Sequence, residues 1–219
     1  MRPKELIFRY TLFLIGLFIA SLGVAFSTKA GLGTSPVASV PYSISIVWHI
    51  MSFGWWLNLC SLLQIIVQVI LLGKECKPLE IVIQTILAFV YGYLTDLSCK
   101  LLSSIEPSSY FEQVFWMLVG CIVLALGIWI QYKGGVAMLP GEAMNRAISK
   151  VTGRRYENIK IAFDILYIAA SVGICLLFIG KLQGVREGSI VAALLVGMII
   201  RFFNSQFDRI FGKKADPCM

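Results

Sequence analysis

The sequence has little charge, a single histidine and none of the short motifs that mark common soluble enzymes. Asp, Glu, Lys and Arg make up 14% of its 219 residues, against about 25% in an ordinary soluble domain. No metalloprotease H-E-x-x-H, hydrolase G-x-S-x-G or phosphate-binding Walker loop is present. His49 lies between Trp48 and Ile50, where it makes a poor catalytic base. These absences exclude a soluble domain, and we expect a protein that is not an enzyme.

The cysteines and the basic residues argue against two further kinds of site. The six cysteines are scattered, with no C-x-x-C pair and no Cys/His spacing of a metal centre. We therefore expect no disulfide framework, no metal and no cofactor. The net charge of +7 comes from Lys and Arg at the edges of apolar runs. This pattern is typical of the orientation signal of membrane proteins, and we expect no nucleic-acid partner.

What the sequence has in abundance is apolar residues, which make up 58% of the chain. A helix that crosses a bilayer needs about 20 consecutive, mostly apolar residues, and six runs fit this requirement. We therefore predict an all-α polytopic membrane protein, folded as a single membrane domain over 1–219. We interpret the first run as an uncleaved span, although basic residues precede it as in a signal peptide. The runs are about 7–27, 54–73, 81–101, 113–132, 159–180 and 188–205.

The chain repeats itself at a constant offset of 104 positions. Between 16–45 and 120–149, eight of thirty positions are identical without a gap. In both copies an apolar run ends in a Lys, passes through glycines and restarts at a Pro. We interpret about 5–104 as repeat 1, about 109–210 as repeat 2 and 211–219 as a cytoplasmic tail. The identical pairs are Gly16 and Gly120, Leu22 and Leu126, Gly23 and Gly127, Lys29 and Lys133, Gly31 and Gly135, Pro36 and Pro140, Ile44 and Ile148, and Ser45 and Ser149.

Two segments, 34–52 and 137–153, follow the repeated glycines and are interrupted by prolines or by charges. If both are half-helices, six full spans remain, and three spans per repeat invert the second copy relative to the first. If both cross the bilayer, there are eight spans and the repeats are parallel. The six-span arrangement places fewer basic residues outside. We prefer it, with inverted repeats and with both termini in the cytoplasm.

The glycine-rich turn of the first copy is the first half of the candidate binding site. Gly31 and Gly33 allow a ligand to approach the backbone, and Thr34 and Ser35 offer hydroxyl groups. The N–H groups at a helix start carry partial positive charge and suit an anion or another polar ligand. The alternative is a plain N-cap and turn between packed helices. Because the motif recurs, we predict that these four residues contribute to substrate binding.

The second copy carries more charge. We predict that Gly135, in its glycine turn, also belongs to the site. Glu142 and Arg146 are four residues apart and so share one helical face. They would form a polar wall with Asn145, in which Glu142 takes a cation or proton and Arg146 holds an anion. The alternative is an internal ion pair that neutralises itself.

Three acidic residues are candidates for proton or ion coupling: Glu142, Asp164 and Asp96. Asp164 lies in an otherwise apolar run, where an acid is a functional candidate by default. The structural alternative is a pair with Lys160, one turn away. Asp96 follows an apolar stretch, and its alternative role is that of a helix-end residue.

These motifs resemble the YczE/YitT-like group of small bacterial integral membrane proteins. The resemblance is carried by the Gly-x-Gly-Thr-Ser-Pro turn at 31–36, by its echo Gly-Gly-Val-Ala-Met-Leu-Pro at 134–140, and by Ile-Ala-Phe-Asp at 161–164. It covers nearly the full chain and implies a bacterial inner-membrane location. It implies little about function, because transport in the group is presumed. The second copy lacks the Gly-Thr-Ser triplet, which argues against a symmetric pair of turns.

The sequence therefore favours a small secondary transporter or permease for a small polar solute, with anions among the candidates and the site at the repeat interface. Two alternatives remain open. One is a membrane scaffold or regulator of a partner protein that transports nothing. The other is a solute-binding subunit of a larger transport complex with its own energy source. The expected partners are the lipid bilayer, the solute, and a second copy or an accessory protein.

Overall fold

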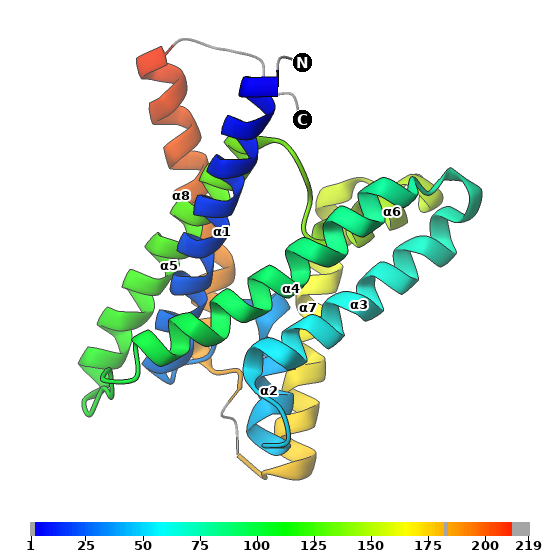
Figure 1. The fold of residues 1–219 in the computed structure, drawn as a ribbon. Helices are drawn as coiled ribbons and strands as arrows, with labels where there is room; N and C mark the ends of the chain where they lie inside the picture. The colour runs from blue at the N-terminus through cyan, green and yellow to red at the C-terminus, as the bar shows by residue number, and fades with distance from the viewer. Residues whose placement is uncertain (1–2, 182–183, 212–219) are drawn as a thin grey trace.

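The computed structural model describes residues 3–181 and 184–211, and within these ranges all regular structure is helical (Figure 1). Six helices are long and apolar enough to cross a membrane, while α2 and α6 are shorter. The predicted all-α polytopic fold is confirmed. Most of the predicted tail 211–219 lies outside the described residues. The elements are α1 (Pro3–Ala30), α2 (Pro36–Val47), α3 (Phe53–Leu72), η1 (Gly73–Glu75), α4 (Pro78–Leu101), α5 (Tyr110–Gly134), α6 (Pro140–Thr152), α7 (Tyr156–Phe178) and α8 (Glu187–Phe211).

Both short helices begin at one of the repeated prolines. Pro36 opens α2 and Pro140 opens α6, so each occupies the first turn, where a missing N–H is not needed. The chain before α2 turns through Gly31 and Gly33, whose φ angles are 74° and 102°. Gly135 ends α5 in the left-handed conformation, with φ 58°. Glycine adopts these angles without steric cost, so each long helix can stop and a short helix can start within a few residues.

The most extensive helix contact joins α1 to α5, which run antiparallel (Figure 1). A Cβ added to Gly16 would lie 2.8 Å from the carbonyl oxygen of Gly127, and one added to Gly120 would lie 3.0 Å from that of Gly23. Small residues allow membrane helices to pack this closely. Gly16 aligns with Gly120 in the sequence and Gly23 with Gly127. The two contacts are therefore related by the repeat: exchanging each glycine for its aligned counterpart turns the Gly16–Gly127 contact into the Gly120–Gly23 contact.

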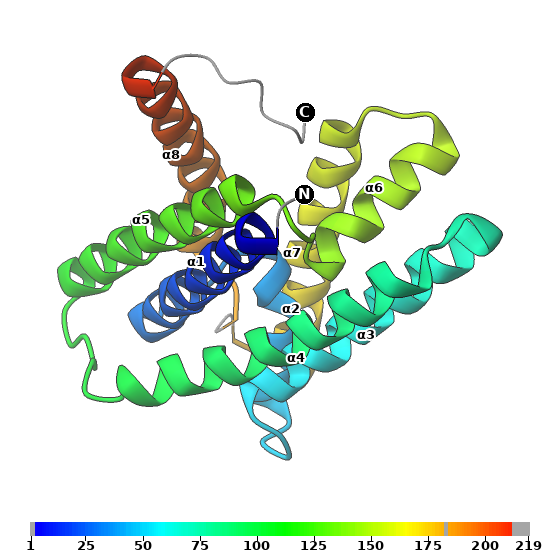
Figure 2. The same ribbon diagram turned by 45° about the horizontal axis from the view of Figure 1, so that its top comes forward.

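The short helices pack across the two halves of the chain. The helix α2 packs against α3 of its own half and α7 of the other, and α6 packs against α7 of its own half and α3 of the other. The helix α8 packs along α5, and α4 packs along α1 and α3. Figure 2 shows that α2 passes beneath the middle of the molecule, between the α1–α5 pair and α7. This arrangement brings the starts of α2 and α6 to the centre of the fold.

Hydroxyl groups hold the buried helices together. Ser43 of α2 and Ser171 of α7 lie 2.5 Å apart at their Oγ atoms, and Ser21 of α1 and Ser98 of α4 lie 3.0 Å apart. All four side chains are buried. In an apolar setting such bonds are the means by which polar side chains between helices are satisfied. The Ser43–Ser171 bond fixes α2 against α7, next to the cavity described below, and the Ser21–Ser98 bond joins α1 to α4.

Candidate functional site

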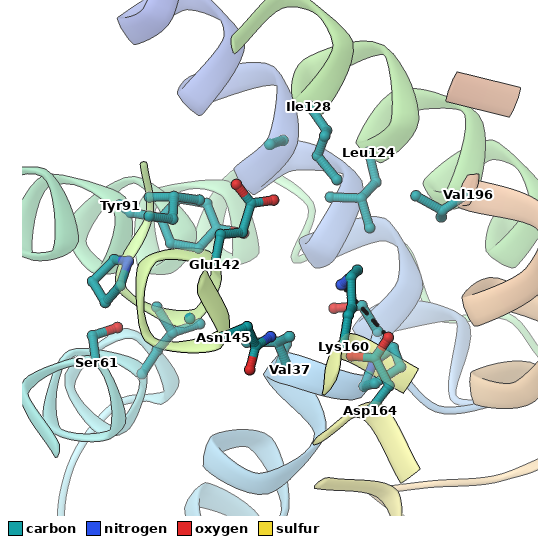
Figure 3. Close-up of a pocket in the computed structure, with 18 of the residues that line it drawn as sticks. Val37, Ser61, Tyr91, Leu124, Ile128, Glu142, Asn145, Lys160, Asp164 and Val196 are labelled. Atoms are coloured by element: carbon teal, nitrogen blue, oxygen red, sulfur yellow. Dashed lines mark ion pairs between the residues drawn. The ribbon is translucent and has the colours of Figure 1, made fainter. Parts of the chain in front are cut away.

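A cavity of about 240 Å³ lies at the centre of the fold, where the two short helices begin (Figure 3). Ser35 and Pro36 line it at the start of α2, and Pro140 and Glu142 line it at the start of α6. All eight helices contribute to its wall. Its volume is slightly below the roughly 300–1,000 Å³ of pockets for drug-sized ligands. The cavity therefore has the size for a small metabolite.

The starts of α2 and α6 nearly touch at the cavity wall. A Cβ added to Gly141 would lie 3.7 Å from Cγ1 of Val37. Neither helix has a side-chain hydrogen bond from its N-cap residue, which is Ser35 in α2 and Leu139 in α6. The first N–H groups of a helix carry about half a positive elementary charge in total. Two uncapped helix starts therefore direct partial positive charge at one cavity.

Glu142 supplies a formal negative charge beside these helix starts. Its Oε1 accepts a hydrogen bond of 2.7 Å from the hydroxyl group of Tyr132 on α5. Within the described chain no ion pair joins Glu142 to Arg146, although the two residues are one turn apart. Arg146 is exposed and does not line the cavity. The geometry thus places the predicted acid in the cavity wall and the predicted anion clamp outside it.

Two buried amide side chains in the cavity wall lack hydrogen-bond partners. Asn145 of α6 is 4% exposed and Gln131 of α5 is 6% exposed. Asn145 Oδ1 and Gln131 Nε2 each have no partner in the described structure. Leaving such a group unpaired in a buried site costs about 1–3 kcal/mol, so a bound polar molecule or water would be stabilising here. Native proteins rarely bury unpaired polar groups without a reason.

Gln64 of α3 adds a third amide to the wall. Its Nε2 donates to the hydroxyl group of Tyr167 at 2.8 Å. A Cβ added to Gly141 would lie 3.4 Å from Gln64 Oε1, so this amide also lies against the start of α6. Together the three amides come from α3, α5 and α6 and face one space.

Asp164 also lines the cavity, together with Lys160. Lys160 Nζ and Asp164 Oδ2 form an ion pair at 3.5 Å along α7. The Asp164 side chain is 24% exposed and the Lys160 side chain is 41% exposed. The ion pair of the structural alternative therefore forms, and both of its members line the cavity. The coupling role of Asp164 stays a prediction.

The glycine turn of the first copy lies beside the cavity and is covered by another segment. Gly33 forms an isolated antiparallel β-bridge with Val185, and Arg186 donates to the carbonyl oxygen of Gly31 at 3.3 Å. Thr34 is fully buried, and its hydroxyl has no partner. Of the four residues predicted in this turn, only Ser35 lines the cavity itself. Gly31 and Gly33 instead contact Arg186 and Val185, and Thr34 is buried next to them in the chain.

Two other predicted residues lie away from the cavity. Gly135 ends α5 and is exposed. Asp96 of α4 accepts hydrogen bonds from Ser52 Oγ at 2.5 Å and from the backbone N–H of Gly54 at 2.7 Å. Both donors lie at the start of α3, so Asp96 caps that helix, while it lies within α4 itself and not at the end of its own helix, where the alternative above would place it.

Gln64, Gln131 and Tyr132 complete the cavity wall but are not among the residues predicted from the sequence. Gln64 and Gln131 lie within apolar runs, which is the signal that would have found them. Buried polar groups in membrane helices face the protein interior, so every Gln in these runs was a candidate. Tyr132 carried no such signal, because tyrosines are also common near membrane surfaces. No group of three or more His, Cys, Asp or Glu side chains within residues 3–181 and 184–211 is placed to hold a metal ion.

The chain is similar to two proteins of Bacillus subtilis over nearly its full length. The chain is 27% identical over 207 residues to the uncharacterized protein YyaS of Bacillus subtilis (strain 168), covering 94% of this chain and 97% of that protein. It is 23% identical over 206 residues to the uncharacterized membrane protein YczE of the same organism, covering 91% and 86%. No solved structure matches the chain. The resemblance to YczE-like membrane proteins is confirmed. Residues 7–205 match the family of unknown function DUF6198, and the protein is a member of that family.

Proposed function

We propose that this protein is a small secondary transporter or permease for a small polar solute. The observation that supports it most is the convergence of the two short helix starts on one cavity. Broken helices that meet near the middle of the membrane form the solute sites of several transporter folds. The cavity lies inside a bundle of six membrane-length helices. The polar groups of the cavity wall would replace the hydrogen bonds that a polar solute loses when it leaves water.

In this proposal the solute satisfies groups that have no hydrogen-bond partner within the described protein. The N–H groups at the starts of α2 and α6 would donate to it, as would Gln131, and Asn145 Oδ1 would accept from it. Glu142 supplies the negative charge of the wall, and the Lys160–Asp164 pair supplies one charge of each sign. Glu142 and Asp164 are the proposed positions for coupling to a proton or another ion.

The distribution of basic residues supports an orientation with the N-terminus in the cytoplasm. Lys29, Lys100 and Lys181 lie at the end of the molecule where α1 meets α2 and α4 meets α5 (Figure 1). The opposite end, where α1 begins and α8 ends, holds more basic residues. Lys and Arg are enriched on the cytoplasmic side of membrane proteins. We therefore propose that α1 starts on the cytoplasmic side, and we propose a bacterial inner membrane because the resemblance to YczE-like proteins implies one. The residues at that end include Lys4, Arg9, Lys133, Lys150, Arg154 and Arg155.

The test begins with purified protein and a panel of small metabolites, screened by thermal unfolding at several pH values with and without sodium. A ligand that binds only the folded state raises the unfolding temperature. Each stabilising solute is then offered to proteoliposomes, and uptake is followed with radiolabel or as a current on a supported membrane. Saturable uptake that is lost in Glu142→Gln, with folding and insertion retained, is the expected result.

Two outcomes would replace the proposal with the alternatives. If a solute binds tightly and is never taken up, the protein is a solute-binding subunit that needs an energising complex. If no solute binds and a protein co-purifies with the chain, it is a scaffold or regulator. Unchanged uptake in both Glu142→Gln and Asn145→Ala would remove the cavity as the transport site.

A further inference from the structure

The cavity wall is divided into a polar side and an apolar side. Figure 3 shows Asn145, Lys160 and Asp164 lying opposite Leu124 and Val196. The polar groups come from α6 and α7, from the amide of α3 and from Gln131 near the end of α5, whereas the apolar groups come from Leu124 and Ile128 of α5 and from α8. A solute that fills this space therefore contacts hydrogen-bonding groups on one side and apolar side chains on the other.

The charges of the wall sum to nearly zero. Glu142 carries one negative charge, and Lys160 and Asp164 cancel each other in their ion pair. The starts of α2 and α6 contribute roughly half a positive charge each. The negative charge of Glu142 is therefore balanced by the partial positive charges of the two helix starts, and the Lys160–Asp164 pair adds no net charge. A solute with a net charge would therefore leave an uncompensated charge in a site of low dielectric, which is costly.

The unpaired groups require both a donor and an acceptor from the solute. Asn145 lacks a partner for its oxygen, and Gln131 lacks one for its nitrogen. Rotating either amide by 180° exchanges oxygen and nitrogen but still leaves a polar atom to be satisfied. These two residues lie on α6 and α5, and both line the cavity. One polar head that carries both kinds of hydrogen-bonding group would satisfy them together.

The apolar side has room because small residues line it. The helix α8 presents Ala192, Ala193 and Gly197 to the cavity, and α1 and α4 present Ala20 and Ala88. Larger side chains at these positions would fill the space beside the apolar groups of α5. The small residues thus leave a hydrocarbon-lined recess next to the polar groups.

We propose that the solute is a small amphipathic molecule of no net charge. Its head, a zwitterion or a neutral amide, lies against α3, α6, α7 and Gln131 near the end of α5, and its apolar body lies against Leu124 of α5 and against α8. This inference rests on the proposed function, because it names the class of substrate for the same cavity. It narrows the expectation from the sequence, in which anions were among the candidates.

The test uses five probes, four of which share one branched hydrocarbon body. These are L-leucine, a zwitterion; 4-methylpentanamide, a neutral amide; 4-methylpentanoate, an anion; and 3-methylbutylamine, a cation. Glycine supplies the zwitterionic head without the body. Thermal unfolding of the purified protein at pH 7 is measured with each probe at increasing concentration. L-leucine, the amide or both should raise the unfolding temperature by about 2–4 °C or more, and the other three by less than a third of that.

Comparing the rise in unfolding temperature with L-leucine and with the amide shows which of the two heads the site prefers. Three results would overturn the inference: stronger stabilisation by the anion or the cation, equal stabilisation by glycine and L-leucine, or no stabilisation by any probe. Its failure is distinguishable from failure of the proposed function. Uptake of a charged solute would overturn the inference and leave the transporter. Binding of L-leucine or the amide without uptake would leave the inference and overturn the transporter.

Two variants test which part of the cavity wall contacts the apolar body of the solute and which part contacts its polar head. Ala193→Phe fills the apolar recess and should abolish stabilisation by L-leucine and by the amide alike. Asn145→Ala removes a head contact and should reduce stabilisation by both at least fivefold in apparent affinity. Ala170→Phe is the matched control, because Ala170 is exposed on α7 and does not line the cavity. Equal loss in the control would show that the Phe acts on folding, and full binding by Ala193→Phe would overturn the placement of the body.

Discussion

The hydroxyl group of Tyr132 donates a hydrogen bond to Glu142 across 2.7 Å, and this contact joins the last turn of α5 to the first turn of α6. The bond uses one carboxylate oxygen and leaves the other for a solute or a proton. It also orients the acid, because the donor is fixed on a long helix that packs against α1. Glu142 is therefore held at the cavity wall by a residue ten positions earlier in the chain.

Replacing Glu142 by Gln should lower uptake of any transported solute by about ten- to a hundredfold. A hydrogen bond to a charged group contributes about 1.5–3 kcal/mol, and the substitution removes that charge with little change of shape. Uptake into proteoliposomes measures the effect. Glu80→Gln is the control, because Glu80 forms only an exposed pair with Lys77 outside the cavity. Equal uptake by the two variants would contradict the role of Glu142.

Replacing Asn145 by Leu should maintain or raise thermal stability while abolishing stabilisation by the solute. The substitution removes a buried oxygen without a partner, and such a group costs about 1–3 kcal/mol. Unfolding curves with and without solute separate the two effects. Asn158→Leu, at an exposed position of α7, is the control and should change neither. A less stable Asn145→Leu protein that still binds solute would show that Asn145 is structural.

Replacing Gly23 by Val should destabilise the protein strongly. A Cβ at this position would overlap the backbone of Leu124, so α1 and α5 must move apart. Overpacking of this kind typically costs about 1–3 kcal/mol or more. Gly173→Val is the control, since nothing lies within 4 Å of a Cβ added there. Thermal unfolding of both variants in detergent is the measurement, and similar melting temperatures would contradict the close crossing.

Replacing Asp96 by Ala should lower stability by about 1 kcal/mol, the usual effect of losing a helix cap. Its carboxylate accepts from Ser52 and from the N–H of Gly54 at the start of α3. The pH dependence of uptake should stay unchanged in Asp96→Asn, because the residue does not line the cavity. A shifted pH profile in that variant would restore Asp96 as a coupling residue.

Cysteines introduced at Lys100 and at Lys77 should react from opposite sides of the membrane. Lys100 lies near the end of α4, and Lys77 precedes that helix. In a background without the native cysteines, an impermeant maleimide should label position 100 in intact cells and position 77 only after permeabilisation. Labelling of position 77 in intact cells, with position 100 protected, would contradict this orientation and would fit the eight-span alternative, in which Lys77 faces out. Labelling of both positions from one side would contradict a membrane-spanning α4.

Hydropathy and the two prolines predicted most of the helical architecture. The six apolar runs correspond to the six long helices, because a bilayer span sets both the length and the composition of its helix. The repeated Pro36 and Pro140 marked the starts of α2 and α6. The duplication itself stays a prediction, which the reciprocal contacts of Gly16 with Gly127 and of Gly23 with Gly120 support.

The candidate site was predicted less completely, for physical reasons. Helical spacing places Glu142, Asn145 and Arg146 on one broad face, but it does not show where the cavity ends along that face. The structure includes the first two in the wall and leaves Arg146 exposed. Gln131 comes from a helix that meets α6 only through tertiary packing, and no local pattern encodes that approach.

The exchange of short helices between the halves has a consequence for how the protein is made. During synthesis the first half reaches the membrane with α2 before α7 exists, and α7 supplies its partner Ser171 for Ser43. The second half likewise needs α3 to seat α6. Each short helix packs more extensively against the other half than against its own. A gene split between α4 and α5 should therefore produce stable protein only when both fragments are made in the same cell.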